Sequence, residues 1–128
     1  MNVLPNAVFG WCSILAGFLT GMLLGMGFHR EEFLGGYASL RRRMLRLGHI
    51  ALVALGGLNV LFALSASQLR LGPAALAVAS GAWMFGGVAM PLCCALMAFW
   101  PAVRPLFALP IVSLSLAAGL VIWGLVRS

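Results

Sequence analysis

Charged residues are so few in this chain that four long apolar segments run without interruption. Of its 128 residues, 8 are basic and 2 are acidic, and 63% are hydrophobic. A helix needs about 20 apolar residues to cross a hydrocarbon core about 30 Å thick. We therefore predict an all-α integral membrane protein, folded as a compact up-down bundle of four transmembrane helices. The predicted spans are residues 7–28, 44–67, 74–100 and 106–126.

The composition excludes two other classes of protein. A soluble domain carries about 25% charged residues, whereas this chain carries 8% and has nothing polar to cover four buried helices. The net charge of +6 would suit nucleic acid, but the charges lie at the ends of the apolar segments. We expect the lipid bilayer as the main partner and no nucleic acid. Short links join the later spans, so residues 1–128 form a single transmembrane domain.

Arginine supplies every basic residue, and the arginines are distributed unequally between the two sides of the predicted bundle. Most lie in or beside the first loop, residues 29–43, and Arg104 falls on the same side. Only Arg70 and Arg127 fall on the other side. The positive-inside rule then places the first loop in the cytoplasm and both termini outside it. We expect the protein in the inner, cytoplasmic membrane of a bacterium.

Ser39 precedes the main arginine cluster and has the side chain of a helix N-cap. A second helix that begins there would hold the following arginines at the level of the lipid headgroups. Each arginine near an anionic membrane surface contributes about 1 kcal/mol of attraction. We predict that anionic lipids bind at Arg41, Arg42, Arg43 and Arg46.

Small residues recur along one face of each predicted span. Helices inside lipid gain little from hydrophobic burial, so close backbone approach and interhelical hydrogen bonds hold them together. Asn59 is a strongly polar residue deep in a span, and we expect its amide to bond across to another helix. The predicted helix-packing residues are Gly17, Gly21, Gly25, Gly56, Asn59 and Gly86.

Residue types that would indicate catalysis or ion coupling are missing from the predicted hydrocarbon core. The predicted hydrocarbon core contains no Asp, Glu, Lys or Arg, whereas proton-coupled pumps place an ionisable residue there. The sequence also has no Ser-His-Asp set, no phosphate-binding glycine loop and no Cys-x-x-Cys pair. We expect that the chain is not an enzyme on its own.

His29 and His49 are the candidate cofactor ligands. One ends the first span and the other lies in the first turns of the second span, so both should lie near the cytoplasmic face. Haem b held by two histidines takes one ligand from each of two helices. A structural interpretation competes, in which His29 is solvated and His49 bonds a backbone carbonyl. We expect no bound cofactor, with haem b or a quinone at these histidines as the alternative.

Sulfur-containing residues form another candidate site, for a metal. One pair lies near the inner end of the first span and a second group lies at similar depth in the third span. Thioether and thiolate sulfurs select Cu(I), but methionines at helical spacing usually pack against helices or lipid. We expect no metal, and the copper alternative would use Met22, Met26, Met90, Cys94 and Met97.

These features together predict a small non-catalytic membrane subunit that packs within a larger membrane protein complex. Its role there would be structural or accessory, filling gaps, holding lipid or shielding cofactors of other chains. We favour a hetero-oligomer with other membrane subunits over a homo-oligomer. Two alternatives stay open. One is a haem b- or quinone-binding subunit of an electron-transfer complex that uses His29 and His49. The other is a homo-oligomeric channel or carrier for a small solute or ion.

Overall fold

Residues 2–127, which the computed structural model describes, contain helices as their only regular elements. The α-helices are α1 Leu4–Phe28, α2 Leu40–Ser65, α3 Pro73–Phe99 and α4 Ala108–Val126. Short 3₁₀ helices lie in the three connections: η1 Phe33–Gly35, η2 Ala66–Gln68 and η3 Pro101–Phe107. Over these described residues, four helical segments are long and apolar enough to cross a membrane, which confirms the predicted fold class.

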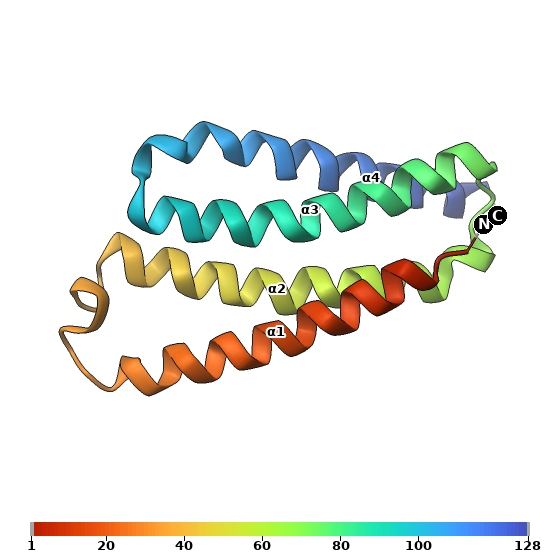
Figure 1. Ribbon diagram of the computed structural model, residues 1–128. Coiled ribbons are helices and arrows are strands. Elements are labelled where there is room, and N and C mark those ends of the chain that lie inside the picture. The colour runs from red at the N-terminus through yellow and green to blue at the C-terminus, as the bar shows by residue number, and fades with distance from the viewer. Residues whose placement is uncertain (1, 128) are drawn as a thin grey trace.

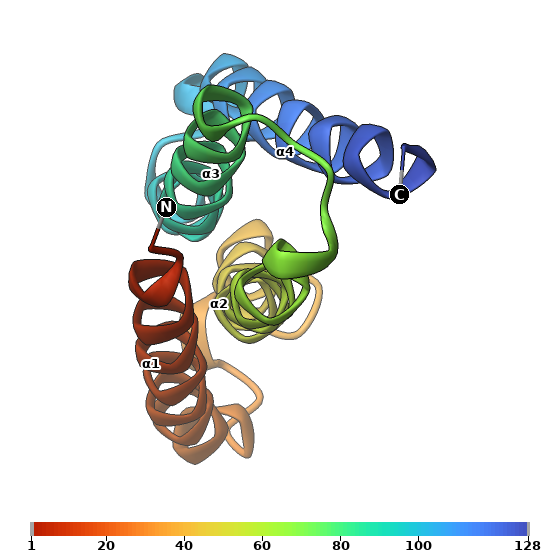
Figure 2. The same cartoon turned by 90° about the vertical axis from the view of Figure 1, so that its right-hand side faces the viewer.

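The helices run up and down in chain order, and each packs along the next (Figure 1). Seen along the helices, they form an array in which α1 and α4 lie at opposite ends (Figure 2). Both ends of the chain lie at the same end of the bundle, while η1 and η3 lie at the other. Because α1 and α4 each pack mainly against one neighbour, most of their circumference faces outward.

The helix boundaries follow the capping chemistry of the sequence. α2 begins at Leu40, earlier than the predicted span, because the Ser39 hydroxyl accepts a hydrogen bond from the Arg42 amide at 3.2 Å. The N-cap predicted at Ser39 is therefore present. α4 begins at Ala108, slightly later than predicted, because the residues before it, Pro101–Phe107, form the 3₁₀ helix η3.

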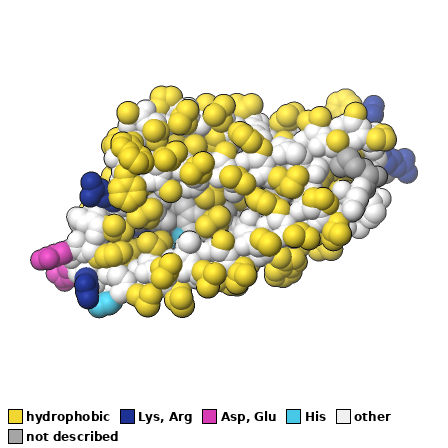
Figure 3. All heavy atoms as spheres, in the orientation of Figure 1, with side chains coloured by type: hydrophobic (Ala, Val, Ile, Leu, Met, Phe, Trp, Pro, Cys, Tyr) yellow, Lys and Arg dark blue, Asp and Glu magenta, His cyan; other side chains and the backbone are white. Residues whose placement is uncertain are grey.

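Apolar side chains cover the length of the bundle, and charged side chains gather at its two ends (Figure 3). A helix that is apolar all round suits a lipid environment. The interior is small, and its largest side chain is Trp83, which is 8% exposed and packs against Phe62 and Ala117. The core therefore joins α2, α3 and α4, in the half of the bundle that holds the termini.

Candidate functional site

Glycines bring α1 and α2 together along α1 from Gly10 to Gly21. A Cβ atom at Gly10 would lie 2.5 Å from the Gly56 carbonyl oxygen, and one at Gly56 would lie 2.7 Å from the Gly10 carbonyl oxygen. A Cβ atom at Gly21 would lie 2.5 Å from Cε1 of His49. Real side chains do not fit at these separations, so the packing of the two backbones depends on glycine.

The other predicted packing glycines divide into two groups. Gly17 faces Val53 of α2, and Gly86 faces Leu114 of α4, so both lie at helix contacts. Gly25 does not, contrary to the prediction, because no atom lies within 4 Å of the position of its Cβ. α1 and α2 separate toward the loop that connects them (Figure 1), so the close contact does not extend to Gly25.

Three buried polar side chains join α1, α2 and α3. Nδ2 of Asn6 donates to Oδ1 of Asn59 at 3.0 Å and to the carbonyl oxygen of Ser80 at 3.1 Å. The Ser80 hydroxyl donates in return to Oδ1 of Asn6. Nδ2 of Asn59 donates to the carbonyl oxygens of Leu55 and Trp83 at 3.0 and 3.2 Å. Both asparagines are 0% exposed, and their amide groups use every donor.

This polar network holds three helices in register and leaves no free amide donor on Asn6 or Asn59 for a ligand. The interhelical bond predicted for Asn59 is present. Its main partner, Asn6, was missed because it precedes the predicted start of the first span. A signal was available: Asn6 lies on the same helix face as Gly10 and Gly17.

Arg42 is buried in the loop end of the bundle. Its side chain is 4% exposed, and Nη2 donates to the carbonyl oxygen of Phe28 at 2.6 Å. The guanidinium also lies over the Phe28 ring, 4.5 Å from the centroid. Phe28 ends α1, and the last carbonyls of a helix have no partner within it. Arg42 therefore caps α1, which corrects its prediction as a headgroup ligand.

The other three arginines of the predicted lipid site have freer surroundings. Arg41 and Arg43 are exposed. The guanidinium of Arg46 lies 5.1 Å from the centroid of Tyr37, which is itself exposed. Anionic lipid at these three positions remains a proposal.

Replacing Arg42 with alanine should destabilise the protein by about 1.5 kcal/mol, because a charge-assisted hydrogen bond to the end of α1 is lost. The matched control is Arg43→Ala, which removes the same charge from an exposed side chain and should change stability by less than about 0.5 kcal/mol. Unfolding of the purified variants in mixed micelles measures the difference. Equal losses for the two variants would mean that Arg42 acts only through its charge.

The two histidines are not brought together. Nδ1 of His49 lies 2.7 Å from the Gly17 carbonyl oxygen, between α1 and α2. His29 is exposed beyond the end of α1. From Gly17 to His29 the chain rises along the helix axis by about 18 Å. Two axial nitrogens must reach one iron from opposite sides, so His29 and His49 of this chain do not form a haem site together.

His49 also lines a groove of about 250 Å³ between α1, α2 and α3. Apart from His49, its wall is formed mainly by apolar side chains, Pro91 and Ala95 of α3 among them. The Thr20 hydroxyl at its edge is bonded to the carbonyl oxygens of Ala16 and Gly17. The imidazole of His49 is therefore the polar feature of this groove.

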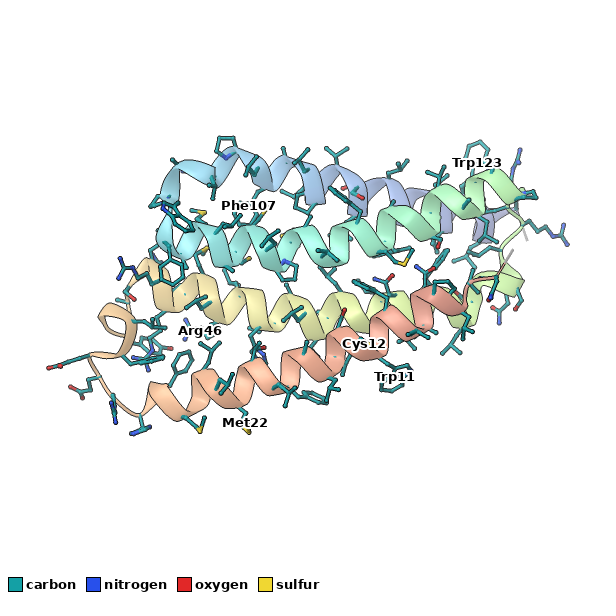
Figure 4. The ribbon with its side chains drawn as sticks, viewed as in Figure 1. Trp11, Cys12, Met22, Arg46, Phe107 and Trp123 are labelled. Carbon is teal, nitrogen blue, oxygen red and sulfur yellow. The ribbon has the colours of Figure 1, made fainter. Side chains whose placement is uncertain are left out.

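The sulfur-containing residues lie in separate environments. Met22 and Met26 are each 57% exposed, and Met22 points away from the bundle (Figure 4). Cys94 is buried in α3 beside Gly48 of α2. Residues 2–127 also contain no group of three or more His, Cys, Asp or Glu side chains that could hold a metal. Met22 and Met26 therefore lie on the outside of the bundle and Cys94 lies inside it, and the copper alternative stays a prediction.

No protein-family model, curated protein or solved structure matches this chain. Its functional interpretation therefore depends on the arrangement of its own residues.

Proposed function

We propose that this chain is a non-catalytic subunit of a larger membrane protein assembly, and that the outward face of α4 binds a helix of another subunit. The observation that carries the proposal is a pair of small residues on α4. Ser115 and Gly119 are exposed, and no atom lies within 4 Å of the Cβ position of Gly119. Ala117, on the opposite side of α4, is 0% exposed and packs in the core.

Small residues at four-residue spacing are a common contact surface between membrane helices. Within the chain, Gly10, Gly56 and Gly86 are each covered by a neighbouring helix or its side chains. An uncovered glycine weakens a helix by about 1 kcal/mol relative to alanine and gains no packing in return. A partner helix on α4 would supply that packing. Ala77 and Gly81 form a second exposed pair, on α3, but lack the hydroxyl group that Ser115 offers.

The placement of charge supports a non-catalytic role. The arginines and the two glutamates of the described chain lie near helix ends, and the apolar spans between them hold no charged side chain. The buried amides of Asn6 and Asn59 use their donors within the bundle. A coupling site for a proton or an ion normally needs an ionisable group within the membrane. The apolar part of the described helices offers one histidine, His49, and its Nδ1 is bonded to the Gly17 carbonyl oxygen.

Gly119→Leu should leave the chain folded but remove it from its assembly. The added side chain meets open space in this chain, whereas it would separate the backbones of a packed partner. The measurement is the native mass of the protein after mild detergent extraction from its own membrane, with thermal unfolding as the test of folding. Gly57→Leu is the matched control, because Gly57 is also open but has large residues on its own face.

Two results would contradict the proposal: a parent chain that extracts as a monomer, or an assembly that survives Gly119→Leu. An assembly made only of copies of this chain would instead favour the homo-oligomeric alternative.

We also propose that both termini face away from the cytoplasm, in the cytoplasmic membrane of a bacterium. The loop end of the bundle holds six arginines, Arg104 among them, and the terminal end holds Arg70 and Arg127. Positive charge favours the cytoplasmic side. Alkaline phosphatase fused to the C-terminus should be active, and a fluorescent protein fused there should be dark. The reverse pattern would refute the orientation.

A further inference from the structure

We propose that the groove beside His49 binds the phenolic head of a membrane-soluble phenol or hydroquinone, with the hydroxyl group donating to Nε2 of His49. This site is independent of the α4 contact surface. It stands on three features of the groove: the protonation of the imidazole, the chemistry of the wall and the size and depth of the space.

The hydrogen bond on one side of the imidazole determines the role of the other side. The Gly17 carbonyl oxygen can only accept, so Nδ1 of His49, 2.7 Å away, carries the proton and donates. In the neutral ring, Nε2 then has a lone pair and no hydrogen. Among the described residues no hydrogen bond is made to Nε2, and glycine at position 21 leaves room beside it, because a Cβ atom there would lie 3.0 Å from this nitrogen. The ring thus offers a fixed acceptor.

The wall around this acceptor is apolar. Leucines of α1 and α2 and two residues of α3 form it, and the Thr20 hydroxyl is bonded to its own helix. A ligand that fits this chemistry has an apolar body and one hydrogen-bond donor. A phenolic hydroxyl is such a donor, whereas the oxidised quinone has only acceptors and would gain no bond to Nε2. The wall consists chiefly of Leu23, Leu24, Leu45, Leu52, Pro91 and Ala95.

The volume of the groove and its level along α2 further restrict which ligands fit. Ligand sites usually range from about 300 to about 1,000 Å³, so a groove of about 250 Å³ suits a single ring rather than a haem. His49 lies about 14 Å along α2 from its first residue, Leu40, at 1.5 Å per residue. This is a level within the apolar part of the bundle, reached from the bilayer. A phenol with an apolar tail can place its ring there while the tail remains in lipid.

The test compares three probes on the full chain in lipid nanodiscs: a decyl hydroquinone under anaerobic conditions, its dimethyl ether and its quinone. The dimethyl ether keeps the ring and the tail but has no donor. We expect the hydroquinone to bind about tenfold more tightly than either, the effect of one hydrogen bond worth about 1.4 kcal/mol. The nitrogen NMR signal of His49 Nε2 should shift only with the hydroquinone.

Two variants distinguish the contribution of the hydrogen bond to His49 from that of the volume of the groove. His49→Phe keeps an aromatic ring but removes the acceptor, so it should abolish the preference for the hydroquinone over the ether. His29→Phe is the matched control and should preserve that preference, since His29 is exposed beyond α1. Ala95→Phe fills the groove from α3 and should weaken binding of all three probes. If His49→Phe fails to fold, two measurements still test the proposal. The Nε2 signal of the parent tests the hydrogen bond, and the titration of Ala95→Phe tests whether the probes bind in the groove.

Several outcomes would overturn the proposal. Equal binding of the hydroquinone and the ether would mean that the groove accepts any apolar group, such as a lipid chain. Tighter binding of the quinone would mean that Nε2 carries a proton. Absence of binding by all three probes would mean that the groove is only a packing defect.

Discussion

Gly56→Leu should destabilise the protein by about 3 kcal/mol, the upper end of the usual cost of overpacking. A Cβ atom at Gly56 would lie 2.7 Å from the Gly10 carbonyl oxygen and 3.0 Å from side-chain atoms of Ser13 and Ile14. A backbone carbonyl cannot move aside as a flexible side chain can, so α1 and α2 must separate. Because close packing is the main attraction between membrane helices, the loss extends along the whole contact.

The neighbouring residue provides the control for this substitution. Gly57 has no atom within 4 Å of its Cβ position, so Gly57→Leu adds the same side chain without a collision. It should leave stability unchanged or raise it by up to about 1 kcal/mol, because leucine favours a helix more than glycine does. Denaturation of both variants in mixed micelles measures the difference. Equal stability of the Gly56 and Gly57 variants would show that α1 and α2 do not approach as closely as described.

Asn59→Leu should cost about 2 kcal/mol. The substitution removes two interhelical hydrogen bonds of Asn59, the bond from Asn6 and the bond to the carbonyl oxygen of Trp83. It also removes a bond within α2, to the carbonyl oxygen of Leu55. Interhelical hydrogen bonds in membranes average about 0.6 kcal/mol each, and the amide of Asn6 loses one of its partners in addition. Unfolding in mixed micelles, with the exposed Gln68→Leu as a control that should be nearly silent, measures this cost.

A double-mutant cycle then isolates the contact between the two asparagines. Asn6→Leu combined with Asn59→Leu should cost less than the sum of the single substitutions, because neither amide is left with an unpaired partner. Strict additivity of the two losses would contradict the network.

Features that depend on local chemistry could be predicted from the sequence. The spans follow from the length of each apolar run and the thickness of a bilayer. The start of α2 follows from Ser39, whose hydroxyl caps the helix through an amide three residues ahead. Most large apolar side chains face outward because the chain has too few polar residues to form a polar exterior around them.

The contacts of individual side chains could not be predicted in this way, as pairs of residues of the same type show. Arg42 and Arg43 are adjacent, yet Arg42 is buried against the end of α1 and Arg43 is exposed. Their side chains leave the helix about 100° apart, and only the path of the loop decides which of them meets the Phe28 carbonyl. Gly21 and Gly25 share a face of α1, but the separation of α1 from α2 leaves only Gly21 in contact.

The sequence by itself therefore determined the membrane fold, the number of spans and the residues able to form contacts. The tertiary structure decided which of those residues meet. Asn6 reaches Asn59 and Ser80 because α1, α2 and α3 converge in the half of the bundle that holds the termini. His49 pairs with Gly17 and not with His29, because the crossing of α1 and α2 sets the ring beside Gly17, and Gly17 lies about 18 Å along the axis from His29. The level at which a residue meets a neighbouring helix, and the residue that its side chain faces there, depend on how all the helices pack. No short stretch of sequence specifies that packing.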